Sequence, residues 1–284
     1  MSLRVVRIYC SVFVMLLTLA TGAAHASPLL VAAQRDGSLV TLDPLTGGIT
    51  STIGSLGTVR VTGLAFDPLT GVLFGNTGGL GSVLDSLVTI DLTTAAVTVI
   101  GSLQTRMPDI AFDANGTLFG IRPHGALFTI NTSTAAATAI GVPTIVGSGN
   151  GLEFGLDGTL YFAPSSITAA ATPQLAMLNP TTGQSTGALA LSMPLPVVPG
   201  LTTDPVSGAL FALSGRPRGP EVDLVRIDPG TGVTTFVGTT GQFDAIAFQP
   251  TSVPEPDATW LLLIGLAAAI LLTKACHRTK AFSA

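Results

Sequence analysis

The chain has 284 residues, charged residues at 10% of positions and a mean hydropathy of +0.62, values that are typical of a chain with membrane segments. Its central part, residues 27–252, has seven arginines, no lysine and fourteen acidic residues. This negative balance excludes a nucleic-acid groove, which needs clustered positive charge. Both cysteines lie outside the central part and His124 is its one histidine, so we expect no disulfide framework, no metal site and no cofactor.

The N-terminus has the pattern of a secretory signal over residues 1–26. Arg4 and Arg7 precede an apolar stretch at residues 8–20, and Ala24 and Ala26 are small residues at the positions that signal peptidase reads. An uncleaved anchor helix is the alternative, but the apolar run is short for spanning a bilayer. We therefore expect export across the inner membrane and cleavage by signal peptidase.

Residues 27–252 are built from a repeat. A segment of the type Gly-Leu-Ala-Phe-Asp recurs at steps of 46, 42, 49 and 45 residues, and a second marker, Leu or Ile followed by Asp or Asn, follows each copy. The positions equivalent to the Phe of the first marker are Phe66, Phe112, Phe154, Thr203 and Phe248. A period of about 45 residues predicts five units in this one domain.

Each unit contains four short apolar or alternating runs that are separated by turn residues. In the second unit these runs are residues 61–66, 72–75, 87–90 and 97–101. The connections carry Asp, Pro and Gly, which favour tight turns. Four strands per unit at this period resemble a β-propeller blade over the whole central part, without the Trp-Asp pair of WD40 repeats. The marker residues are then expected to be core.

The two ends of the repeat predict how the ring closes. The first unit lacks its innermost strand, since it begins at residues 29–32, whereas the last unit supplies only an innermost strand, residues 244–248. Pairing of these two segments gives a closed five-bladed, all-β propeller without a free edge. An open β-solenoid or a sandwich is the alternative, but neither explains a missing strand that is matched by a spare one.

The connections between strands alternate between the two ends of such a ring. One end collects seven Asp residues without an arginine, and we interpret these as turn-forming residues. The opposite end collects the long loops and most of the basic residues, together with several acids. We expect a ligand-binding face there for an anionic glycan, because arginine makes planar contacts with carboxylate, sulfate or phosphate. Its predicted residues are Arg35, Arg60, Arg106, Arg122, His124, Arg216 and Arg218.

An alternative function uses carboxylates near the axis. Asp109, Glu153 and Asp244 each replace a small or uncharged residue of the repeat at the start of an innermost strand. Paired carboxylates serve glycoside cleavage, so the alternative is a polysaccharide hydrolase or lyase. We favour structural irregularity or a hydrated channel as the account of these three replacements, and a purely structural spacer is a third class. We favour a binding or structural module that is not an enzyme.

The C-terminal residues 253–284 form a second targeting segment. Val253-Pro254-Glu255-Pro256 precedes an uncharged stretch at residues 258–273 and a basic end. Sixteen residues give ~24 Å of helix, and snorkelling of Lys274 extends the span to the ~30 Å of a bilayer core. An ordinary single-pass anchor that is never cleaved is the alternative. Positive charge after the helix keeps that end cytoplasmic and the repeat exported.

The order of motif, helix and basic end resembles the PEP-CTERM sorting signal over about the last 30 residues. The basic residues are more diluted here than the compact arginine cluster usual in that family. The resemblance implies an exported protein of a Gram-negative bacterium that an exosortase-like membrane protease processes. It also implies a final location at the cell surface or in the extracellular matrix, where an extracellular polysaccharide is an expected partner.

Overall fold

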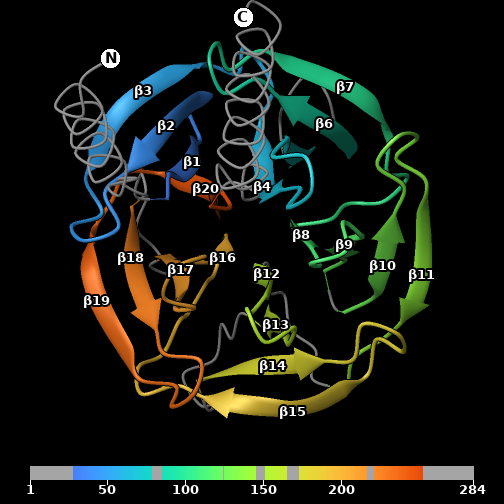
Figure 1. The fold of residues 1–284 in the computed structure, drawn as a ribbon, viewed down its shortest axis with the longest axis vertical. Helices are drawn as coiled ribbons and strands as arrows, with labels where there is room; N and C mark the ends of the chain where they lie inside the picture. The colour runs from blue at the N-terminus through green and yellow to red at the C-terminus, as the bar shows by residue number, and fades with distance from the viewer. Residues whose placement is uncertain are drawn as a thin grey trace, which may run out of the picture.

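The computed structural model describes residues 28–78, 85–123, 125–144, 151–164, 173–215 and 221–251. The described residues form five four-stranded antiparallel sheets around one axis (Figure 1). In chain order the strands are β1 (Leu30–Gln34), β2 (Ser38–Leu42), β3 (Ile49–Ser55), β4 (Val61–Phe66), β5 (Leu73–Thr77), β6 (Ser86–Ile90), β7 (Val97–Ser102), β8 (Asp109–Phe112), β9 (Leu118–Ile121), β10 (Leu127–Ile130), β11 (Ala137–Gly141), β12 (Gly151–Phe154), β13 (Leu160–Ala163), β14 (Gln174–Leu178), β15 (Ser185–Ala190), β16 (Leu201–Thr203), β17 (Leu210–Gly215), β18 (Val222–Ile227), β19 (Thr234–Thr239) and β20 (Phe243–Phe248).

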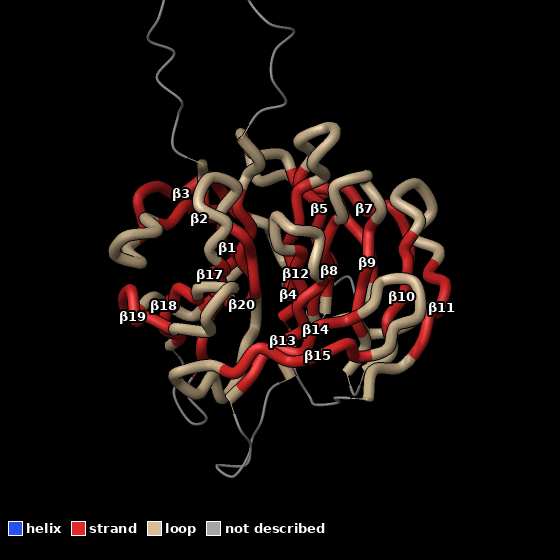
Figure 2. The backbone as a smooth tube through the Cα atoms, turned by 60° about the horizontal axis from the view of Figure 1, so that its bottom comes forward, coloured by secondary structure: helices blue, strands red, loops and turns tan. Residues whose placement is uncertain are grey.

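Each sheet is one blade, and its strands follow one another from the axis to the rim. From inside to outside, blade 1 is β20-β1-β2-β3, blade 2 is β4 to β7, blade 3 is β8 to β11, blade 4 is β12 to β15 and blade 5 is β16 to β19. The predicted five-bladed β-propeller is therefore confirmed. Figure 2 shows that loops join the strands, and the described part of the chain contains no helix long and apolar enough to cross a bilayer. The predicted signal segment and tail helix lie outside the described residues.

The ring closes by pairing strands from opposite ends of the chain. Strand β20 pairs antiparallel with β1, and Leu30 lies opposite Phe248 while Ala32 lies opposite Ile246. Outside the strands, the backbone N–H of Gln249 donates to the carbonyl of Leu29 at 2.8 Å. The predicted closure is thus confirmed. It removes the free edge that β1 would otherwise expose at the axis.

The hydrophobic core consists of five clusters, one between each pair of neighbouring blades. Residues of β1 and β4 share one cluster, for example, and residues of β20 and β17 share another. Apolar side chains of the two inner strands of each blade therefore pack against the next blade. At 25 cal/mol per Å², this burial is the main stabilising contribution to the ring.

Aromatic pairs join the blades at the repeat positions that the sequence marks. Phe112 of β8 contacts Phe74 of β5 edge-on with ring centroids 5.3 Å apart. Equivalent pairs join β9 to β12 and β17 to β20 at the same separation. At the other two junctions Thr203 or Val31 occupies one of the two positions. The marker positions are buried, as predicted, except Phe154, which is partly buried and packs against the core.

Candidate functional site

The two ends of the ring differ in chemistry. We call the end that holds the first and third connection of each blade the turn end, and the opposite one the arginine end. Gln249 and Leu29 are bonded at the turn end, so the described chain begins and stops there. The innermost strands run from the arginine end to the turn end, because the tight turns that follow β4 and β8 carry Asp67 and Asp113.

The acids of the turn end are turn-forming, as predicted. The carboxylate of Asp67 accepts the backbone N–H of Leu69 at 2.9 Å, and that of Asp113 accepts two backbone N–H groups. Asp91 accepts bonds from Thr93 and Thr94 through both their hydroxyls and their N–H groups, which lowers its pKa to about 2. These bonds account for the recurrence of Asp at this end.

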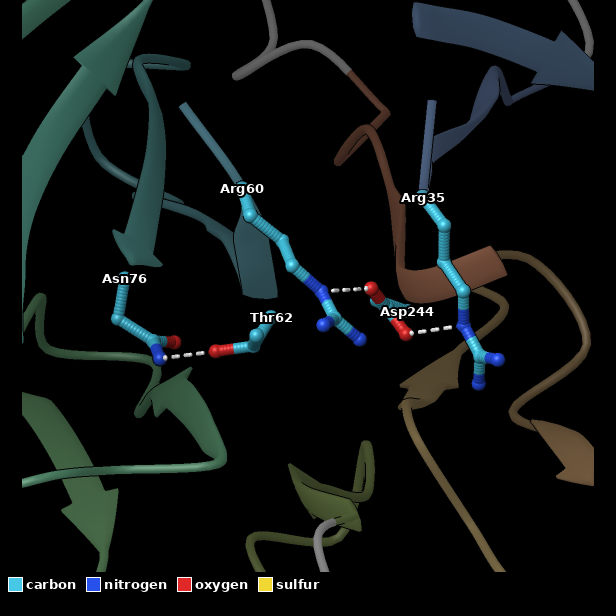
Figure 3. Close-up of polar contacts among 5 residues, drawn as sticks. All are labelled: Arg35, Arg60, Thr62, Asn76 and Asp244. Atoms are coloured by element: carbon cyan, nitrogen blue, oxygen red, sulfur yellow. Dashed lines mark hydrogen bonds and ion pairs between the residues drawn. The ribbon is translucent and has the colours of Figure 1, made fainter. Parts of the chain in front are cut away.

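Asp244 and two arginines form an ion-pair triad near the axis at the arginine end (Figure 3). The Nε of Arg35 donates to Oδ1 of Asp244 at 2.9 Å, and the Nε of Arg60 donates to Oδ2 at 2.7 Å. The side chain of Asp244 is 7% exposed, whereas those of the arginines are 38% and 34% exposed. The hydrogen bond to Asp244 raises the pKa of Arg60 above its usual value.

The triad spans the seam at which the ring closes. Asp244 lies on β20, Arg35 follows β1, and Arg60 precedes β4 of the next blade. Asp244 therefore ties the C-terminal strand to the N-terminal strand and to blade 2. Both ion pairs use the Nε atoms of the arginines (Figure 3), and the triad carries one excess positive charge.

We predict that Asp244→Ala lowers the free energy of unfolding by about 2 to 3 kcal/mol, less than for a fully buried pair because both arginines can rehydrate. Urea denaturation of the variant and the wild type measures this difference. Glu221→Ala removes an exposed acid at the same end and serves as the control. If both variants lose the same free energy of unfolding, the triad does not stabilise the closure of the ring.

Of the remaining residues of the predicted ligand-binding face, two belong to the described part of the chain and three do not. Arg106 and Arg122 are exposed, the first between β7 and β8 and the second between β9 and β10. Both connections lie at the arginine end. His124, Arg216 and Arg218 lie outside the described residues. The structure therefore brings Arg35 and Arg60 together around Asp244 and leaves Arg106 and Arg122 open to solvent.

Asp109 is buried on the innermost strand β8, with an exposed fraction of 1%. Its Oδ1 accepts the backbone N–H of Ile110 at 3.0 Å, and its Oδ2 accepts that of Leu152, from the next blade, at 3.0 Å. Desolvation is the largest influence on this carboxyl and raises its pKa well above the usual value, and the charge of Glu153 acts in the same direction. Asp109 thus joins the inner strands of two neighbouring blades, β8 of blade 3 and β12 of blade 4.

Asn76 is a buried polar residue beside Asp109 that the sequence analysis missed. Its Nδ2 donates to Thr62 at 2.9 Å (Figure 3) and to the carbonyl of Met107, while its Oδ1 has no partner among the described residues. A side chain on Gly63 would collide with Oδ1 of both Asn76 and Asp109, so glycine is required at this close approach. The signal for Asn76 was its polar character at a repeat position that is apolar in other blades.

Glu153 reaches a cavity at the turn end, which we call the axial cavity. This cavity has a volume of about 560 Å³, and the last residue of every innermost strand lines it. Desolvation raises the pKa of Glu153 well above its usual value. Neither Asp109 nor Asp244 lines the axial cavity.

The three carboxylates of the alternative catalytic prediction therefore do not line one cavity. Asp244 is bonded to two arginines, Asp109 is bonded to backbone N–H groups, and Glu153 faces the axial cavity at the turn end. A paired-carboxylate mechanism needs two carboxyls that can both reach the substrate. Within the described residues, no cluster of three or more His, Cys, Asp or Glu side chains could hold a metal ion.

Comparison with known proteins identifies the fold alone. No protein-family model and no curated protein matches the chain. A chain in the crystal structure of a nidogen/laminin complex matches 80% of this chain over 100% of its own length, with a TM-score of 0.54 and 15% identity. A protein of unknown function from Bacteroides caccae matches 79% of this chain over 99% of its own length, with a TM-score of 0.51 and 10% identity.

Proposed function

We propose that this protein is an exported binding module of the cell surface or extracellular matrix, and that it binds an anionic polysaccharide through its arginine end without catalysis. The observation that carries the proposal is the triad at this end. Asp244 holds Arg35 and Arg60 on either side of it through their Nε atoms (Figure 3), and among the described residues their terminal nitrogens have no ion-pair partner and can contact a ligand. Guanidinium groups that are fixed before binding lose little entropy when they contact carboxylate or sulfate.

The position of the chain ends supports this choice of face. The described chain begins and stops at the turn end, with Leu29 bonded to Gln249. The segment that resembles a PEP-CTERM signal follows directly after this point in the sequence. A protein held in the membrane by that segment would turn its arginine end away from the bilayer, where an extracellular polymer can reach it.

Binding is tested with dextran sulfate as the anionic probe and with dextran as its neutral counterpart. Arg106→Gln combined with Arg122→Gln removes two exposed charges from the arginine end and spares the triad. We expect the affinity for dextran sulfate to fall about 10-fold, since each lost contact to an anion contributes roughly 0.5 to 1 kcal/mol at an exposed site. Arg226→Gln, which removes an exposed arginine near the turn after β18, is the matched control.

An equal loss in Arg226→Gln would reject the arginine end as the binding face, and full retention of binding by the double variant would show that Arg106 and Arg122 do not contact the probe. Binding of dextran at equal strength would instead indicate recognition of neutral sugar. Both results are read from titrations at low and at physiological salt, because contacts between exposed charges weaken with screening.

Export and processing require a separate measurement. The sequence predicts cleavage after residue 26 by signal peptidase and a second cleavage near Val253-Pro254-Glu255-Pro256 by an exosortase-like enzyme. Intact-mass spectrometry of the protein released from the producing cells gives both termini at once. A released form that retains residues 258–273 would contradict the second cleavage, whereas a form that retains residues 1–26 would contradict the first.

A further inference from the structure

The axial cavity is a chemically distinct site at the opposite end of the ring from the arginines. The last residues of the five innermost strands form its wall, and these are Phe66, Phe112, Phe154, Thr203 and Phe248. Prolines of four neighbouring connections extend the wall outward, and these are Pro68, Pro180, Pro205 and Pro250. A volume of about 560 Å³ lies within the ~300 to 1,000 Å³ of cavities that hold small organic ligands.

All titratable side chains in this wall are acidic. They are Asp113, Glu153 and Asp157, and no arginine, lysine or histidine is among the described residues that line the cavity. Asp113 and Asp157 belong to turns, where their oxygens accept backbone N–H groups. Within the described part of the chain, the carboxyl of Glu153 accepts one backbone N–H, that of Phe154. Among the described residues of the wall, Glu153 is thus the acid with spare acceptor capacity.

We propose that the axial cavity binds a small organic cation, a protonated amine or a quaternary ammonium group with an apolar substituent, and that Glu153 is its counter-ion. The largely apolar wall lowers the local dielectric constant, which strengthens an ion pair formed against it. Phenylalanine rings stabilise a cation when it lies over the ring face. An anionic ligand would meet three carboxylates and no compensating positive charge.

The electrostatics of the inner strands agree with this choice. Burial raises the pKa of Glu153, and the charge of Glu153 raises the pKa of the neighbouring Asp109. An organic cation next to Glu153 would compensate both the lost hydration and the repulsion between the two acids. Binding should then favour the ionised carboxylate of Glu153, so the affinity should increase with pH, with Asp109, Asp113 and Asp157 as the other acids near the site.

The test is calorimetric titration of the purified full chain with benzyltrimethylammonium. Benzyl alcohol and benzoate, which are neutral and anionic compounds of similar size, serve as comparison ligands. We expect saturable binding of the cation alone and a loss of at least 10-fold in affinity in Glu153→Gln, which keeps the shape of the side chain. Glu221→Gln, an exposed acid at the arginine end, should bind as the wild type does.

Three results would overturn the proposal: no saturation by the cation, undiminished binding in Glu153→Gln, or equal binding of benzyl alcohol. The last of these would indicate an apolar site without charge selection. Thermal unfolding of Glu153→Gln distinguishes lost binding from lost structure. The variant should melt no lower than the wild type at pH 7, because desolvation raises the pKa of Glu153 and glutamine removes the charge that desolvation penalises.

Discussion

Replacement of Phe112 by alanine should lower the free energy of unfolding by about 3 to 5 kcal/mol. The ring of Phe112 is 7% exposed and joins blade 3 to blade 2 through its edge-on contact with Phe74. Alanine removes this pair and opens a space between two blades that backbone shifts can only partly fill. For a domain of this size, each 1 kcal/mol corresponds to roughly 2 to 4 °C, so the melting temperature should fall by about 10 °C.

Phe236→Ala is the matched control, because Phe236 lies on the outermost strand β19 and is 53% exposed. Its loss should change the free energy of unfolding by roughly 0.5 kcal/mol or less. Both variants are measured by thermal melts and by urea denaturation. If Phe112→Ala melts within ~2 °C of the wild type, the repeat position does not carry the packing between blades.

The repeat predicted the architecture because both of its physical causes are local. Apolar alternation in each run specifies a strand with one buried side, and Asp, Pro and Gly between the runs specify the turn. The closure also followed from the sequence, since a missing inner strand at one end matched the spare strand that became β20. Strand bounds differ from the predicted ones by one or two residues, as in β5, which begins at Leu73 and ends at Thr77.

At the turns before the outermost strands, the position in the repeat determines the backbone conformation even where the residue disfavours it. Glycine occupies the positive-φ position in three of these turns, for example Gly232 at φ 72°, but Ala95 and Ala135 adopt φ 59° and 61° at the equivalent positions. Alanine rarely adopts this conformation. Its side chain is fully buried at both positions, so packing against the neighbouring blade compensates for the strain.

The candidate site could be predicted only in part. The sequence placed Arg35 and Arg60 at one end of the ring, but not their shared contact with Asp244, whose partners are 209 and 184 residues away in the chain. Glu153 and Asp109 were recognised as irregularities near the axis. In the structure, Glu153 faces the axial cavity and Asp109 accepts backbone N–H groups. This difference depends on the side-chain directions in neighbouring blades, which the repeat does not encode.

Asp109→Ala should destabilise the ring by about 3 to 5 kcal/mol, because at least two buried backbone N–H groups lose their acceptor. These are the N–H groups of Ile110 and Leu152, each 3.0 Å from an oxygen of Asp109. Asp109→Asn should lower the free energy of unfolding far less than Asp109→Ala does. Its amide oxygen can still accept from the backbone, and its N–H₂ can donate to the neighbouring unpartnered Oδ1 of Asn76.

The difference in the free energy of unfolding between Asp109→Asn and the wild type should depend on pH. Burial raises the pKa of Asp109 above its usual 3.8, so the folded protein retains a proton that the unfolded chain has released. The stability contributed by this proton is present below the unfolded pKa and is lost as the pH rises through the folded pKa. Asparagine cannot ionise, so the variant should gain stability relative to the wild type between pH 4 and pH 8.

Urea denaturation at both pH values measures this change, with Glu153→Gln present in both proteins so that ionisation of the neighbouring, partly buried Glu153 does not contribute. If the two free energies of unfolding differ by the same amount at both pH values, Asp109 has the same pKa in the folded and the unfolded chain. An Asp109→Asn variant as unstable as Asp109→Ala would show that the two oxygens act as an anion toward the backbone N–H groups. In that case the bond to Asn76 does not form, and the hydration lost on burial is compensated by backbone N–H groups, those of Ile110, Leu152 and Leu201.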